Sequence, residues 1–396
     1  MYKVVIIGSG GAGMTAAIEA SKNIDNILLL TKSGLGFSNT AMAQGGIAAS
    51  ICEPDNPEVH YEDTMKCGHF DNVPALVRVL TGSSMEVVRW LEEQGLNFDR
   101  DKTGRYMFKP SIGSTFPRLL SCGDNIGARI VTVLAEKVRG SGVTVKENHR
   151  VLDIKRRKKV FQVYCEANGR IVIECERILL SSGGSCYKIA AQKKLITSNC
   201  SDATGEVMEM AVKLGAKTAE RDSLQYHPMG YVLPLSLRGR PVPESLLSLG
   251  AVLSDREGPI DIEKVGRRSD LSAYMFKRHD ENKAYRVGEA GAFKLDISPV
   301  LEKYGKDFLK KSFPGLASVA KTQGMDLDKD PFFVFPTLHY QNGGIVIDGN
   351  AWTGVEGMYA AGEITGGVHG SNRLMGNSLL DVICFGRIAG IAAARG

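Results

Sequence analysis

The sequence lacks the cysteine spacings that hold a metal ion or an iron–sulfur cluster. Eight cysteines are scattered along the 396 residues, and none of them forms a C-x-x-C pair. This spacing gives no zinc or cluster site of the usual kind, and isolated free thiols are typical of a reducing compartment. We therefore expect no metal site and a cytoplasmic location.

Long hydrophobic runs are also missing. No stretch of about 18 apolar residues occurs, and a strand-like segment begins as early as Val4. We therefore expect no secretion signal and no membrane-spanning segment. The formal net charge of +5 is spread out, apart from one basic run from Lys155 to Lys159. That run lies between short apolar segments, so we interpret it as a solvated hairpin turn and expect no nucleic-acid partner.

Glycine, in contrast, is abundant, and its most informative cluster is close to the N-terminus. The apolar segment from Val4 to Ile7 leads into G-x-G-x-x-G, formed by Gly8, Gly10 and Gly13, and then into an alanine-rich helical segment. In a dinucleotide site the first glycine makes the tight turn, and the second lets the backbone approach a pyrophosphate. The third lets the helix lie close to the strand. The context favours a nucleotide site, and a glycine turn in another α/β protein is the alternative.

The end of the second predicted strand narrows the choice of nucleotide. An NAD site usually has Asp or Glu at this point, whereas this chain has Thr31 and Lys32. This difference disfavours NAD and leaves FAD. The small residues from Gly34 to Ser50 favour close contact between the backbone and a flat ligand.

The remaining pattern predicts an α/β protein with an inserted domain. A helix is expected over Val73 to Gly95, and Asn168-Gly169 predicts a hairpin turn. Strand and glycine signals weaken between residues 221 and 336 and return afterwards. We expect a Rossmann-like, doubly wound, mainly parallel sheet in residues 1–220 and 337–396, interrupted by a separate inserted domain in 221–336. In the last helix Gly386, Gly390 and Ala394 recur every four residues, which favours close packing on the sheet or on the first helix.

Several separated motifs now resemble those of one family. They are G-S-G-G-A-G from Gly8, A-Q-G-G from Ala43, Y-H-P from Tyr226, H-Y-x-x-G-G from His339, Y-A-A-G-E from Tyr359, and H-G-S-N-R with G-N-S-L-L-D from His369 to Asp381. These motifs and their order resemble those of the flavoprotein subunits of succinate dehydrogenase and fumarate reductase, and those of L-aspartate oxidase. The resemblance implies an FAD-dependent oxidoreductase in which the inserted segment 221–336 is an α+β capping domain. A small dicarboxylate substrate is then expected between this cap and the flavin. The chain ends soon after the last motif, so its outline is closer to the fumarate reductase flavin core.

The resemblance implies a set of FAD-binding positions. Asn39 stands where membrane-complex members carry a histidine that bonds covalently to FAD, so non-covalent FAD is expected. Glu363 is expected to bind the adenosine ribose, and the start of the last helix is expected to lie at the flavin pyrimidine. The expected cofactor-binding residues are Gly8, Gly10, Gly11, Ala12, Gly13, Thr31, Lys32, Ser38, Thr40, Gln44, Gly45, Gly46, Gly183, Glu363, Asn377, Ser378 and Leu379.

The resemblance also implies a substrate site. His227, His339 and Arg373 are the residue types that clamp carboxylates, and Arg373 has a planar fork for a bidentate contact. Glu244 and Arg268 complete the expected catalytic set. The direct alignment, however, puts Ser269 at the family's proton-carrying arginine, and Leu247 at a second arginine of the proton relay. Arg268 takes the first role only if the segment is shifted by one residue, and Tyr274 is another candidate.

These departures leave three functions open. The first is a dicarboxylate oxidoreductase acting on succinate, fumarate or L-aspartate. The second is an electron-transfer flavoprotein subunit of a larger redox complex, which requires a redox partner protein. The third is a reductase of another unsaturated carboxylic acid, with Tyr274 or Arg268 as the acid.

Overall fold

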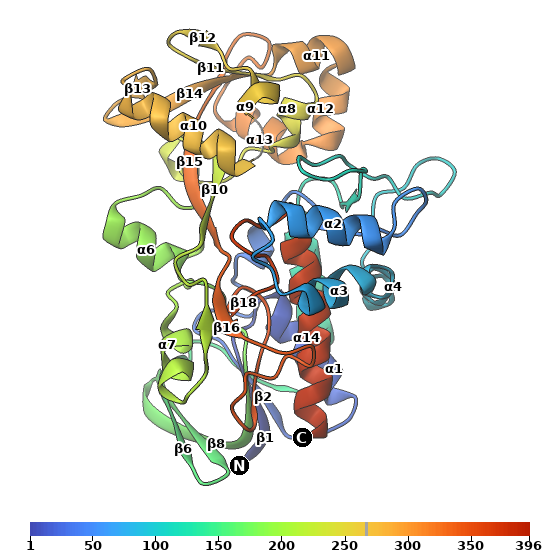
Figure 1. The fold of residues 1–396 in the computed structure, drawn as a ribbon, viewed down its shortest axis with the longest axis vertical. Helices are drawn as coiled ribbons and strands as arrows, with labels where there is room; N and C mark the ends of the chain where they lie inside the picture. The colour runs from blue at the N-terminus through green and yellow to red at the C-terminus, as the bar shows by residue number, and fades with distance from the viewer. Residues whose placement is uncertain (266–267) are drawn as a thin grey trace.

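The larger sheet is parallel at its centre and carries the N-terminus (Figure 1). In this computed structural model, residues 1–265 and 268–396 are described. Strands β5, β2, β1 and β8 lie side by side and parallel, and β17 pairs in parallel with the C-terminal end of β8. Their bounds are Thr144–Lys146, Ile27–Leu30, Tyr2–Ile7, Gly169–Leu180 and Met358–Ala360. The order confirms the α/β class, because helical crossovers are what link parallel strands.

An antiparallel hairpin extends this sheet. Strand β7 (Val160–Ala167) pairs with β8 and with β6 (Arg150–Arg157). The predicted turn at Asn168-Gly169 is confirmed: Ala167 pairs with Gly169, whose φ of 128° suits glycine. The basic run was only partly a turn, because Lys155 to Arg157 complete β6 and only Lys158 and Lys159 connect the strands.

The last helix, α14 (Asn377–Arg395), packs on the first, α1 (Gly11–Ser21). A Cβ atom on Gly386 would lie 2.8 Å from the carbonyl oxygen of Ala12, and one on Gly390 would lie 2.4 Å from that of Ala16. The glycine face expected from the sequence therefore lies against the first helix. In length and composition α14 could cross a membrane, but 72% of its apolar window is buried inside the protein, as in the core helix of a soluble protein.

The helix predicted over Val73 to Gly95 is wrong as one element. The segment forms two helices, α3 (Pro74–Gly82) and α4 (Ser84–Gln94), which meet at Ser83. Glycine and serine are weak helix formers, and the Ser84 hydroxyl donates to the carbonyl oxygen of Thr81, 2.8 Å away. The other helices before residue 221 are α2 (Pro57–Cys67), α5 (Ile126–Arg139), α6 (Cys186–Lys193) and α7 (Glu206–Lys213), with the 3₁₀ turn η1 (Thr40–Met42).

A second sheet has its own hydrophobic core, with Phe293, Leu295 and Val334 at its centre. It is antiparallel, in the order β10, β15, β14, β11 and β12, with β13 also on β14. The strands are β10 (Leu224–Tyr231), β11 (Val252–Asp255), β12 (Gly258–Pro259), β13 (Tyr285–Val287), β14 (Ala290–Asp296) and β15 (Phe332–Gln341). Its helices are α8 (Ser245–Ser248), α9 (Ile262–Val265), α10 (Arg268–Asp280), α11 (Ser298–Tyr304), α12 (Lys306–Ser312) and α13 (Pro314–Thr322), with η2 (Leu235–Leu237).

Strands β10 and β15 run from this upper layer down to the larger sheet (Figure 1). Smaller pairings lie beside them: β3 (Ile47–Ala48) with β4 (Leu119–Leu120), and β16 (Gly344–Val346) with β9 (Thr218–Ala219) and β18 (Thr365–Gly366). The capping domain expected over residues 221–336 stays a prediction. The second of these boundaries falls inside β15.

Candidate functional site

One large cavity starts at the carboxyl ends of the parallel strands and reaches the antiparallel layer. Its walls include Gly8 to Ala12 after β1, Thr31 and Lys32 after β2, Ser181 to Gly183 after β8, and Ala361 to Glu363 after β17. This edge is where open α/β sheets bind nucleotides.

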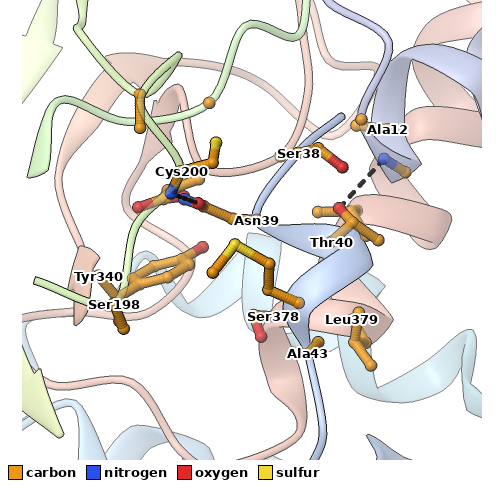
Figure 2. Close-up of a pocket in the computed structure, with 18 of the residues that line it drawn as sticks. Ala12, Ser38, Asn39, Thr40, Ala43, Ser198, Cys200, Tyr340, Ser378 and Leu379 are labelled. Atoms are coloured by element: carbon orange, nitrogen blue, oxygen red, sulfur yellow. Dashed lines mark hydrogen bonds between the residues drawn. The ribbon is translucent and has the colours of Figure 1, made fainter. Parts of the chain in front are cut away.

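The glycine motif forms the wall beside α1. The N-cap of this helix is Gly10, which has no side chain to cap it, and Gly10, Gly11 and Ala12 line the cavity. The Gly11 N–H donates to the Thr40 hydroxyl over 3.1 Å (Figure 2). Gly13 does not line the cavity: a Cβ there would lie 1.9 Å from the carbonyl oxygen of Gly8, so its role is close packing.

The end of β2 forms a polar corner of the cavity. The Ser9 hydroxyl donates to the Thr31 hydroxyl over 2.8 Å. The Lys32 ammonium donates to the Thr204 hydroxyl over 3.0 Å and to Glu206 over 3.4 Å. Sequence reasoning found Thr31 and Lys32 but missed their partners, because Thr204 and Glu206 belong to a segment that only the fold brings here.

The segment around η1 lies across the middle of the cavity. Ser38, Thr40, Gln44, Gly45 and Gly46 all line it, as expected, together with Gly183. Figure 2 shows Ser38 and Thr40 on one side and Asn39, Ser198 and Tyr340 on the other. The buried Gln44 Oε1 and Ser182 Oγ atoms have no hydrogen-bond partner among the described residues. These side chains therefore fit a long ligand with polar groups, as FAD requires.

Glu363 lies in a different part of the cavity from the one expected. It follows β17, and β1 and β8 separate that strand from β2, a distance of roughly 14 Å at the usual strand spacing. Glu363 accepts hydrogen bonds from the Gln341 N–H (3.1 Å) and the Asn39 amide (3.2 Å). Burial raises the pKa of this carboxyl. Its position favours the flavin half of FAD rather than the adenosine ribose.

The N-terminus of α14 meets the cavity through Ser378 and Leu379 (Figure 2). Asn377 does not line it. The Asn377 side chain instead contacts α2: its Oδ1 lies 2.8 Å from His60 Nε2, and its amide donates to the Thr64 hydroxyl over 3.0 Å. Asn377 thus fixes the helix end whose neighbouring residues face the ligand space.

His227, Glu244, Arg268, His339 and Arg373 converge at the capped end of the cavity. They come from β10, the start of α8, the start of α10, β15 and the segment before α14. Arg268 Nη2 and Nε lie 2.5 and 2.7 Å from Glu244 Oε2, and His227 Nε2 lies 3.8 Å from the same oxygen. The two histidine rings stand edge to face, with centroids 5.4 Å apart.

Hydrogen bonds hold both histidines in place. The Met229 N–H donates to His227 Nδ1 over 3.2 Å, so neutral His227 carries its proton on Nε2. His339 Nδ1 lies 2.7 Å from the Ser198 hydroxyl. The Arg373 guanidinium lies 4.3 Å from the centre of the Tyr340 ring. Sequence reasoning missed Ser198 and Tyr340; Tyr340 had a signal, because it adjoins His339 in its motif.

Burial and the arginines set the charge of this cluster. Burial, followed by repulsion from Arg268, lowers the pKa of His227 to about 3, and burial holds the pKa of His339 well below its usual value. Burial also lowers the pKa of Arg373 to about 10, which leaves the side chain charged at neutral pH. Burial alone would raise the pKa of Glu244, but attraction to the Arg268 guanidinium and the hydrogen bond from it outweigh burial, and the pKa is lowered. The site thus presents two arginine cations, one carboxylate and two neutral imidazoles.

The alternative proton carriers do not reach the cavity. Ser269 Oγ is buried and has no partner among the described residues, and it lies outside the cavity wall. Tyr274 and Leu247 pack against the core of the antiparallel sheet. Arg267, which precedes Arg268 in the sequence, lies outside the described residues. Within residues 1–265 and 268–396, no group of three His, Cys, Asp or Glu residues is placed to hold a metal.

Comparisons with known proteins agree with this geometry. The family model described as "FAD binding domain" matches residues 3–379. One subunit of the fumarate reductase (CoM/CoB) of Methanothermobacter marburgensis is 35% identical, over 99% of this chain and 72% of that protein. The L-aspartate oxidase of Streptomyces coelicolor is 31% identical, over 99% of this chain and 68% of that protein.

Solved structures show the same fold. FrdA of Escherichia coli quinol fumarate reductase superposes with a TM-score of 0.89 at 26% identity, covering 100% of this chain and 70% of that one. Sdh1 of Mycobacterium smegmatis superposes with a TM-score of 0.82 at 32% identity, covering 100% and 68%. The chain therefore belongs to the family of FAD-dependent oxidoreductases that includes fumarate reductase and succinate dehydrogenase flavoproteins and L-aspartate oxidases.

Proposed function

We propose that this flavoprotein transfers a hydride between flavin N5 and a small dicarboxylate, of the succinate/fumarate or L-aspartate type. The observation that carries the proposal is the position of Arg268, which pairs with Glu244 in the same wall as His227, His339 and Arg373. The sequence left open whether Arg268 or Ser269 stands at the proton-carrying position. Arg268 lines the cavity and Ser269 does not, which supports Arg268 as the proton carrier. Bound FAD supplies the hydride acceptor or donor.

The protein residues have separable roles in this proposal. Arg373 binds one substrate carboxylate through its charged fork, since it lines the cavity together with His227 and His339. His227 and His339 offer neutral ring nitrogens to the substrate oxygens. Arg268 delivers or removes the proton at the carbon next to the one that exchanges the hydride. Glu244 holds the Arg268 guanidinium at that point and keeps the charge of the pair balanced.

The cofactor contacts follow the cavity. We assign the pyrophosphate to the backbone at the start of α1, and the adenosine ribose to the corner beside Thr31 and Lys32. Glu363 is assigned to the ribityl hydroxyls and the start of α14 to the flavin pyrimidine. Non-covalent binding is proposed because Asn39 has no nucleophilic side chain, and its amide already pairs with Asn199 (2.6 Å) and Glu363.

A second candidate is an electron-transfer flavoprotein subunit. Leu247, which stands where relatives carry a relay arginine, is part of the packing around the cap core. A weakened relay predicts slow turnover by the isolated chain and faster turnover with a redox partner protein.

Anaerobic mixing tests these functions. The oxidised protein is mixed with succinate or L-aspartate, and the photoreduced protein with fumarate, while flavin absorbance is recorded. We expect bleaching or recovery with at least one of the three. No change with any of them contradicts a dicarboxylate oxidoreductase. Recovery only with a panel of other unsaturated acids would instead support a different enoate substrate.

A further inference from the structure

A second, much smaller chamber lies behind the Arg268–Glu244 pair. Its walls include Arg268, Glu244 and Arg373, which also face the large cavity, and Cys67, Ile112 and Gly113, which do not. Its volume is about 10 Å³. A space of this size admits one water molecule, provided that polar atoms face it.

Two of these wall residues each carry a buried polar atom that has no partner among the described residues. Glu244 Oε1, an acceptor, and Arg373 Nε, a donor, form no hydrogen bond with any described residue. Both residues are almost fully buried, with 3% and 4% of their surface exposed. An unmet hydrogen bond at such a depth destabilises the folded protein, because the buried group has lost its bonds to water. A water molecule in the chamber accepts from Arg373 and donates to Glu244, which removes both costs.

The far wall of the chamber reaches the surface. Ile112 is half-buried and Gly113 is exposed, so this wall is thin. The family resemblance puts a relay arginine at position 247, where this chain has leucine. Leu247 offers no polar atom there, because its side chain packs at the cap core and lines neither cavity.

We propose that a water molecule held between Glu244 and Arg373 carries protons from solvent to Arg268, past Ile112 and Gly113. This inference rests on the proposed function, in which Arg268 exchanges the substrate proton. In the reductive direction, the Arg268 guanidinium gives a proton to the substrate carbon. A proton from solvent then passes through the chamber water to the Glu244 carboxylate, which hands it to Arg268 and becomes ionised again. No electrons move in this relay.

Filling the chamber tests the proposal. Ile112→Phe places a larger side chain against the chamber, and Ile112→Val is the matched control. The first reoxidation of the reduced flavin by an unsaturated acid uses the proton that the Arg268 guanidinium already carries. Its rate should therefore be the same in Ile112→Phe as in the unaltered protein. Repeated turnover should fall at least 10-fold, because every later cycle needs a proton from solvent. Cys67→Leu fills the chamber from another side and should have the same effect.

A readout independent of activity is a high-resolution crystal structure. We expect a water molecule within hydrogen-bond distance of Glu244 Oε1 and Arg373 Nε in the unaltered protein and in Ile112→Val, and its exclusion from Ile112→Phe. The proposal is overturned if no water lies there, if filled variants turn over normally, or if first and repeated turnovers fall together. If the unaltered protein reacts with no acid at all, the proposed function fails instead.

Discussion

Removing the Arg268 side chain should abolish turnover without preventing FAD binding. Arg268 and Glu244 are 9% and 3% exposed, and two nitrogens of Arg268 lie within 2.7 Å of one Glu244 oxygen. Loss of a positioned acid–base group lowers rates by about 10²–10⁴. Arg268→Met also leaves a buried carboxylate without its main partner, at a cost of about 3–5 kcal/mol in unfolding free energy.

A double mutant separates the two effects. Glu244→Gln with Arg268→Met removes both charges, so most of the lost stability should return, to within about 1 kcal/mol of the unaltered protein. Turnover should stay low, because the proton carrier is still missing. Ser269→Ala is the control, since that hydroxyl lies outside the cavity wall.

The assays are urea unfolding, flavin content and anaerobic reoxidation by fumarate and other unsaturated acids. The reasoning is refuted if Arg268→Met keeps normal turnover while Ser269→Ala loses it. It is equally refuted if the double mutant recovers activity together with stability.

Three further predictions follow from the same structure. Acid or urea treatment should release FAD into the supernatant, since Asn39 forms no covalent bond; colour that stays with the precipitate would contradict this. The free energy of unfolding should fall by about 2 kcal/mol between pH 6.5 and 5.5, counting His60 and His227 together. Burial lowers the pKa of each to about 3, so in this pH range only the unfolded chain takes up protons on them. Urea unfolding at both pH values measures the change, and equal stability at the two would refute the prediction. Gly390→Val should lower the free energy of unfolding by about 1–3 kcal/mol, because the valine side chain would meet the α1 backbone. Gly82→Ala is the control: the space around Gly82 is open, so this change should be neutral or slightly stabilising. Equal melting temperatures for the two variants would contradict the packing argument.

Local chemistry explains the parts of the fold that the sequence predicted well. The strand–glycine–helix unit and the turn at Asn168-Gly169 depend on residues that are adjacent in the chain. The close packing of Gly390 could be predicted because a helix face made of glycine and alanine lets another element approach its backbone closely. The break at Ser83 was missed, because the apolar spacing of α3 continues almost in phase into α4.

The site was harder to predict where distant segments meet. His227, His339 and Arg373 lie together, as the motifs predicted. The choice between Arg268 and Ser269, however, depends on where α10 begins. Neighbouring helix positions differ by about 100° around the axis, so only one of them faces the cavity. Ser198, which supports His339, has no sequence signal, because its contact depends on the fold. The place of Glu363 within the cavity could not be predicted either, since strand order is not visible in a motif.

The most direct test of the central claim is a crystal structure of the FAD-loaded protein with a bound dicarboxylate such as fumarate. We predict one carboxylate on Arg373, with the histidines around the ligand. The Arg268 guanidinium should lie against one carbon of the double bond, with flavin N5 against the other. A ligand bound elsewhere, or Arg268 turned away from it, would contradict the account.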